Sequence, residues 1–159
     1  MSPLLVLTGA FVVALLATKY FTKAFRYPLS GRIAMSVMLL FTATGHFLFP
    51  QGMALMIPDF IPFKREVVLL TGLIEIAAAI GLLVPRLQVI TAWLLIAFFI
   101  LVLPANIHAA IQHIDYQTGA RTGNGIAYLW FRIPLQVFFI LWTYFSAIRP
   151  QRQKHQPAI

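Results

Sequence analysis

Five long apolar segments, separated by short polar stretches, dominate the pattern of hydrophobic and polar positions in this chain. They cover roughly residues 4–17, 33–49, 67–84, 89–111 and 127–148. The last four approach or exceed the ~20 residues with which an α-helix crosses the hydrocarbon core of a bilayer. The pattern therefore predicts an all-α, polytopic membrane bundle with a four-helix core and the first segment as a fifth transmembrane helix.

The first apolar segment is the shortest, and its length is also typical of the hydrophobic part of a signal peptide. No cation precedes it, however, and Lys19, Lys23 and Arg26 follow it, which reverses the charge order of a signal peptide. We therefore expect a retained transmembrane helix. A helix lying in the membrane interface is the alternative.

Composition supports the membrane assignment and excludes several classes of function. Hydrophobic residues make up 60% of the chain and charged residues 10%, against about a quarter charged residues in a typical soluble domain. The absence of cysteine excludes disulfides, thiolate nucleophiles, iron–sulfur clusters and CxxC-type redox chemistry. The net charge of +8 does not indicate nucleic-acid binding, because the cations lie at the ends of apolar segments, where they set topology.

The loop charges predict the orientation of the chain in the membrane. One side carries eight cations: Lys19, Lys23, Arg26, Arg32, Arg86, Arg149, Arg152 and Lys154. The other side carries three: Lys64, Arg65 and Arg121. Because the more basic side stays in the cytoplasm, we expect the N-terminus outside and the C-terminus in the cytoplasm, with a bacterial inner membrane as the setting.

This topology divides the chain into three parts. Residues 1–30 form the N-terminal helix with a basic cytoplasmic loop, residues 31–149 form the four-helix bundle, and residues 150–159 form a cytoplasmic tail that we expect to be disordered. Two loops, 50–66 and 112–126, fall on the outer side. The first of them contains Pro58 and Pro62, which indicate a rigid, turn-rich loop.

Glu75 is the residue that carries most information about function. It lies in the middle of the third apolar segment, which contains no cation. An unpaired carboxylate at bilayer depth costs several kcal/mol, so such a group faces the bundle interior and has a partner or a bound proton. Small residues around it, including Gly72 and Ala79, indicate either a close helix approach or space for a ligand.

Further polar side chains lie at a similar depth on other helices. Counted from the outer helix ends at ~1.5 Å per residue, they fall in the outer half of the bilayer, whereas the inner half is predicted to be nearly pure hydrocarbon. The candidate ligand-binding residues are His46, Glu75, Asn106, His108, Tyr128, Arg132 and Gln136. Each histidine or amide alone can be an interhelical hydrogen-bonding group, but together we expect them to line one pocket.

The only opposite charges at this depth predict an ion pair between Glu75 and Arg132, either direct or bridged by water or Gln136. Extension of Arg132 toward the interface is the alternative. Tyr128, Arg132 and Gln136 are spaced four residues apart and share one stripe of their helix. We expect this stripe to form one wall of the pocket.

Several short motifs occur in a fixed order along the chain: GHFLFP at 45–50, IPDFIP at 57–62, TGLIEIAAAIGLLVP at 71–85, LPANIHAAI at 103–111 and FRIPLQ at 131–136. In this order they resemble the DoxX and DoxX-like family of integral membrane proteins over residues 31–142. The resemblance implies a four-helix membrane bundle. It also implies a link to redox chemistry, since members are associated with a thiosulfate:quinone oxidoreductase and with membrane complexes of oxidative-stress enzymes. Distant vertebrate relatives are associated with receptor assembly, and they share the glycine–acid pattern that Gly72 and Glu75 match. The resemblance therefore implies an architectural role for these two residues as the alternative.

These observations favour an accessory subunit that binds a lipophilic small molecule. A quinone accepts a hydrogen bond at each carbonyl, and the His, Arg, Asn and Gln side chains supply donors, while Glu75 can relay protons. No cofactor motif or cysteine is present to carry electrons, so a partner redox enzyme is expected to do so. The alternative is a non-enzymatic scaffold or assembly factor, in which the charged pair fixes helix register.

Two further hypotheses remain. A b-type haem held by His46 and His108 is one, because the two imidazoles lie at similar depth on different helices. A self-sufficient intramembrane enzyme with Glu75 as general acid or base is the other, although no residue pattern identifies its substrate. We expect no metal site, since only one carboxylate lies at membrane depth.

Overall fold

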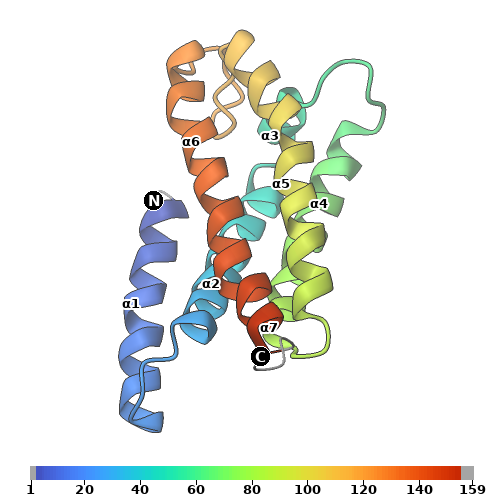
Figure 1. Cartoon of the computed structure of the whole chain (residues 1–159). Coiled ribbons are helices and arrows are strands. Elements are labelled where there is room, and N and C mark those ends of the chain that lie inside the picture. The colour runs from blue at the N-terminus through green and yellow to red at the C-terminus, as the bar shows by residue number, and fades with distance from the viewer. Residues whose placement is uncertain (1–2, 155–159) are drawn as a thin grey trace.

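The computed structural model describes residues 3–154, which form helices joined by short connections (Figure 1). The helices are α1 (Pro3–Thr22), α2 (Tyr27–Leu48), α3 (Pro50–Met56), α4 (Lys64–Leu83), α5 (Gln88–Ile111), α6 (Ile126–Thr143), the π-helix η1 (Tyr144–Ile148) and α7 (Arg149–Lys154). No strand occurs in this range. Five of the described helical segments are long and apolar enough to cross a membrane. The fifth is Ile126–Gln151, which comprises α6, η1 and the start of α7. The predicted all-α, multi-pass membrane fold is confirmed.

The bundle has two distinct ends. The loop end carries α3 and the connections 57–63 and 112–125, whereas the turn end carries the short connections 23–26 and 84–87. Figure 1 shows α3 and the α5–α6 connection at the loop end, and α7 near the turn end.

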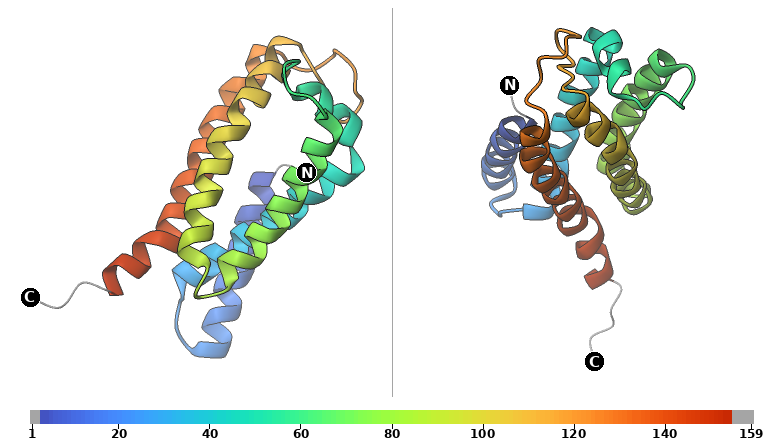
Figure 2. Two further views of the ribbon diagram at one scale, coloured as in Figure 1. Left: turned by 90° about the vertical axis from the view of Figure 1, so that its right-hand side faces the viewer. Right: turned by 90° about the horizontal axis from the view of Figure 1, so that it is seen from above.

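Two helix pairs make up the core. α2 packs along α4 and α5 packs along α6, while α4 also contacts α5. Figure 2 shows α5 and α6 side by side, with α2 and α4 as the second pair. α1 packs against α2 and is shifted toward the turn end, so that its last turn extends beyond the rest of the bundle (Figure 1).

The apolar core fills the half of the bundle nearer the turn end. Its fully buried side chains include Met35, Met38 and Leu39 of α2, Leu82 of α4 and Leu95 of α5. Many other apolar side chains are exposed on the outside of the helices, as expected where hydrocarbon instead of water surrounds the bundle. The polar candidate residues are therefore left to the half nearer the loop end.

The turn-end half nevertheless contains buried polar groups, so the prediction of nearly pure hydrocarbon there is wrong. The side-chain amide of Gln88, 2% exposed, donates to the carbonyl of Ala147 in η1 at 3.3 Å. The indole Nε1 of Trp142 donates to the carbonyl of Gly31 at 3.0 Å. Both bonds join segments far apart in the sequence. The hydrophobic periodicity of the helices does not indicate that these side chains point into the bundle.

The loop end is closed by residues 112–125, which we call the cap loop. Within it, the backbone N–H of Gly123 donates to the carbonyl of His113 at 2.7 Å. A Cβ atom on Gly52 of α3 would collide with the carbonyl of Tyr116, so α3 and the cap loop are in direct backbone contact. α3 itself lies where the sequence predicted a turn-rich loop.

An exposed ion pair fixes the connection between α3 and α4. Nζ of Lys64 lies 2.6 Å from Oδ1 of Asp59. The hydrogen bond and the positive charge of Lys64 hold the pKa of the Asp59 carboxyl below its ordinary value.

The C-terminal tail differs in part from its prediction. Residues 149–154 continue the fifth span as α7, although a disordered tail was expected from residue 150. The remainder of the tail, residues 155–159, lies outside the described residues.

Candidate functional site

Glu75 is buried between α4 and α2, and its partners come from α2. Only 7% of the surface of this residue is exposed. The hydroxyl of Thr42 donates to Oε2 of Glu75 at 3.0 Å, and Nε2 of His46 lies 3.4 Å from the same oxygen. The prediction of a direct ion pair between Glu75 and Arg132 is therefore wrong, because His46 takes the place that the sequence assigned to the arginine.

The imidazole of His46 contacts two side chains of α4, Thr71 and Glu75. Thr71 of α4 lies with its hydroxyl 3.1 Å from Nδ1 of His46, and the same hydroxyl donates its only proton to the carbonyl of Val68 at 2.7 Å. Nδ1 is then the donor to Thr71, which leaves Nε2 to face the carboxyl group. Nε2 lies 3.4 Å from Oε2 of Glu75, within ion-pair distance.

A second polar cluster is centred on Asn106 of α5, which is 1% exposed. Its Oδ1 accepts hydrogen bonds from the hydroxyl of Tyr128 at 3.5 Å and from Nε of Arg132 at 3.3 Å. Its Nδ2 donates to Oε1 of Gln136 at 3.4 Å, and the Gln136 amide donates in turn to the carbonyl of Phe99. The three side chains of the predicted α6 stripe thus converge on one amide.

The two clusters belong to different helix pairs, α2 with α4 and α5 with α6. No hydrogen bond or ion pair among the described residues joins one cluster to the other. Arg132 consequently has no acidic partner within the described chain. Its contacts there are the amide of Asn106 and the ring of Tyr128, whose centre lies 5.9 Å from the guanidinium carbon.

His108 belongs to neither cluster. Its Nδ1 lies 3.1 Å from the carbonyl of Met56 at the end of α3, so it ties α5 to the loop end. A b-type haem between His46 and His108 does not fit this arrangement, because both ring nitrogens of His46 already face hydrogen-bonding partners. Within residues 3–154, no group of three or more His, Cys, Asp or Glu side chains could hold a metal ion.

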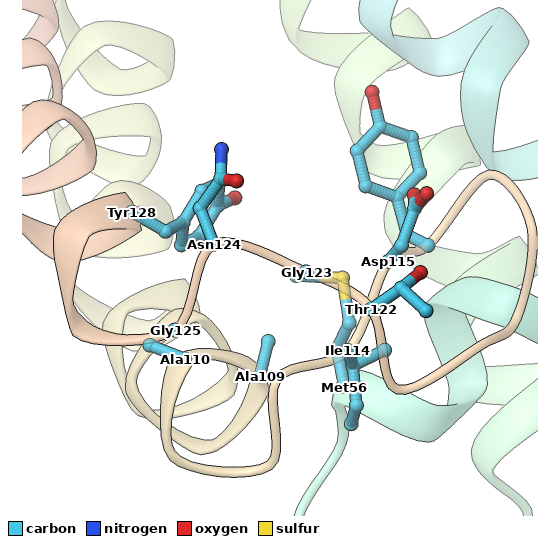
Figure 3. Close-up of a pocket in the computed structure, with 11 residues that line it drawn as sticks. Met56, Ala109, Ala110, Ile114, Asp115, Thr122, Gly123, Asn124, Gly125 and Tyr128 are labelled. Carbon is cyan, nitrogen blue, oxygen red and sulfur yellow. The ribbon is translucent and has the colours of Figure 1, made fainter.

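A pocket of about 260 Å³ lies at the loop end, beneath the cap loop. Figure 3 shows Tyr128 and Asn124 on one side of it and Asp115 on the other. Met56, Ala109, Ala110 and Ile114 supply apolar surface. Of the seven predicted site residues only Tyr128 lines this pocket, and its hydroxyl connects the pocket to Asn106.

Sequence reasoning missed Thr42 and Thr71, although a signal was present. Thr42 precedes His46 by four residues, and Thr71 precedes Glu75 by four residues. Residues four apart share a helix face. Thr42 therefore faces the same neighbouring helix as His46, and Thr71 faces the same neighbouring helix as Glu75. A hydroxyl on the face of a buried ionisable group is a candidate partner for it.

Comparison with known proteins gives a family without an assigned activity. The model of the domain of unknown function DUF8561 matches residues 35–147, and the chain belongs to this family. No curated protein and no solved structure matches the chain. The matched region contains every candidate site residue and leaves α1 outside.

Proposed function

We propose that this member of the DUF8561 family binds the polar head of a lipophilic small molecule, of quinone type, beside Asn106. It then acts as an accessory subunit, and a partner enzyme supplies the redox chemistry. The likeness to DoxX proteins, the placement in a bacterial inner membrane and the cytoplasmic C-terminus belong to the same proposal. The loop end is then the outer end.

Arg132 is the observation that carries the proposal. It lies six residues into α6, or ~9 Å along the helix axis from its start. Only its Nε makes a hydrogen bond within the described chain, so the terminal N–H groups of the guanidinium are left for another acceptor. A cation at membrane depth without an acid is costly, and an electron-rich carbonyl oxygen of a ligand would reduce this cost.

The surroundings of Arg132 fit a ring with carbonyl groups. The hydroxyl of Tyr128 and the amides of Asn106 and Gln136 can exchange their mutual hydrogen bonds for bonds to a ligand. The pocket beside Tyr128, about 260 Å³, is below the ~300–1,000 Å³ of typical sites for drug-sized ligands. It therefore suits a head group alone, with an isoprenoid tail left in the bilayer.

In this proposal the Glu75–His46 pair, on the helix pair α2 and α4, supplies groups that exchange protons. Reduction of a quinone to a quinol takes up two electrons, which the partner enzyme provides, and two protons. A buried carboxyl group and an imidazole 3.4 Å apart can pass a proton between them with little movement of their heavy atoms. The side chains of Glu75 and His46 are 9% and 18% exposed, which leaves His46 as the more accessible member.

The first test is the thermal midpoint of the purified protein with and without menaquinone and ubiquinone analogues. A ligand that binds only the folded state raises the midpoint by mass action. We expect an increase for the wild type and for Gln88→Ala, and none for Asn106→Ala or Arg132→Gln. Gln88 is a matched control because it is an equally buried amide at the opposite end of the bundle. An unchanged wild-type midpoint with both analogues would exclude quinone binding.

A scaffold or assembly role is the second candidate, favoured by the packing at Gly72. A Cβ there would lie 2.9 Å from Cβ of His46, so α2 and α4 are in close contact at the level of Glu75. Under this alternative the Glu75–His46 pair sets the register of two helices and takes no part in ligand binding. Glu75→Gln keeps the shape and one acceptor of the side chain. If that variant folds but no longer binds the analogue, the register role does not account for Glu75.

A further inference from the structure

The charges of the chain are distributed unevenly between the two ends of the bundle. The chain has 12 Lys and Arg residues but 4 Asp and Glu residues, and Asp59, Glu66 and Asp115 all belong to the loop end. The fourth acid, Glu75, is engaged with His46. The described cations of the turn end therefore have no acidic partner within the described chain. Nε of Arg32, near the start of α2, is even buried there without a hydrogen bond.

Two of these cations line a shallow pocket of about 370 Å³ on α1. Its walls are formed by Leu16, Lys19, Tyr20 and Lys23. Leu16, Lys19 and Tyr20 follow the spacing i, i+3, i+4 and so share one face of the helix, and Lys23 comes directly after its last residue. Along this face the chemistry changes from an aliphatic side chain at Leu16 to a phenol and two ammonium groups at the helix end. That order matches the order of groups in a phospholipid, from acyl chain to phosphate.

Local structure holds both lysines at the helix end. Nζ of Lys19 lies 4.5 Å from the centre of the Phe25 ring, a cation–π contact. Lys23 ends the helix with φ +58°, a left-handed conformation that glycine adopts more easily. A lysine at such a position keeps a second positive charge one turn beyond Lys19 at the expense of backbone strain.

We propose that this face of α1 is a binding site for an anionic phospholipid. The lipid phosphate lies between Lys19 and Lys23, the phenol of Tyr20 contacts the head group, and an acyl chain follows Leu16. Because the last turn of α1 extends beyond the rest of the bundle (Figure 1), the ammonium groups reach the head-group layer while Leu16 remains in hydrocarbon. The lipid then supplies the negative charge that the protein lacks at this end.

Native mass spectrometry of the delipidated full-length protein in mild detergent tests this site. The protein is titrated with phosphatidylglycerol or with phosphatidylcholine of the same acyl chains. We expect preferential binding of phosphatidylglycerol, weakened on the order of tenfold in the double variant Lys19→Gln with Lys23→Gln, since each cation near a membrane surface contributes modestly to anionic lipid binding.

The matched control is Arg86→Gln with Arg149→Gln, which removes the same charge from the same end but from outside the pocket. An equal loss of lipid in both double variants would show diffuse attraction and overturn the proposal, as would equal binding of the two lipids by the wild type. Inorganic phosphate alone should not displace the lipid; complete displacement would mean that the site recognises a free anion. If the lysine double variant does not fold, Lys23→Gly removes one charge at a position whose backbone favours glycine, and it must also weaken binding.

Discussion

At the scale of single residues, Glu75 and Arg132 show that position along a helix specifies the depth of a side chain but not its interaction partner. Glu75 is buried near the middle of α4, and Arg132 is half-buried in the part of α6 nearer the loop end. Their pairing depends on which helices are neighbours, and α4 packs on α2 and α5. The acid therefore meets an imidazole and a hydroxyl of α2, and the arginine meets an amide of α5.

His46→Ala is expected to destabilise the protein by about 1–3 kcal/mol, because Glu75 then loses one of its two side-chain partners and remains buried. Thr44→Ala is the control, since Thr44 lies two residues away on the same helix and is exposed. Chemical unfolding of both variants in mild detergent measures the difference. Equal free energies of unfolding for the two variants would contradict the assigned role of His46.

At the scale of elements, the contact between α2 and α4 depends on the missing side chain of Gly72. Its Cβ would approach Cβ of His46 to 2.9 Å and the ring of Phe47 to 3.2 Å. Small residues permit such close helix packing in membranes, where no hydrophobic driving force brings helices together. The small residues around Glu75 therefore serve helix approach, which is one of the two roles expected from the sequence.

Gly72→Ala should destabilise the bundle by about 1–3 kcal/mol through overpacking. Gly9→Ala is the matched control, because a Cβ on Gly9 of α1 meets nothing within 4 Å and alanine is the better helix former by ~0.5–1 kcal/mol. The two changes should thus act in opposite directions on the free energy of unfolding. A stabilising Gly72→Ala would show that α2 and α4 are not in close contact.

The cap loop and α3 form a second element-scale contact, at Gly52. Gly52→Ala places a Cβ against the backbone of Tyr116 and should release residues 112–125, which hydrogen exchange of their amides would report. Gly45→Ala, whose Cβ meets only the flexible end of Met53 at 3.3 Å, should leave that exchange unchanged. Unaltered protection in Gly52→Ala would mean that α3 does not hold the cap loop.

At the scale of the whole molecule, the sequence predicts the architecture and the shared face of Tyr128, Arg132 and Gln136, but not how the other polar residues pair. Runs of apolar residues define the spans because each helix must satisfy its own backbone in lipid. Four-residue spacing places Tyr128, Arg132 and Gln136 on one face of α6, where they converge on Asn106. The sequence could not show that the polar residues divide into two clusters, since that depends on the lateral order of helices. α3 was missed because a helix of seven residues that begins at Pro50 and is soon followed by Pro58 carries little periodicity.

The two ends of the protein differ in the groups that they carry. The loop-end half, within the region shared with the DUF8561 family, holds both polar clusters and the pocket beneath the cap loop. The turn-end half holds the apolar core and, on α1, a face suited to an anionic lipid. α1 lies outside the family match, so loss of the lysine face should leave quinone-analogue binding at Asn106 intact.

Quinone binding at Asn106 can be measured by solvent extraction of the protein purified in mild detergent, with bound isoprenoid quinone quantified per mole of protein. We expect a stoichiometric quinone in the wild type and in Gln88→Ala, and its loss in Asn106→Ala, whose amide joins Tyr128, Arg132 and Gln136. Quinone absent from all three, or present equally in all three, would contradict a binding site at Asn106.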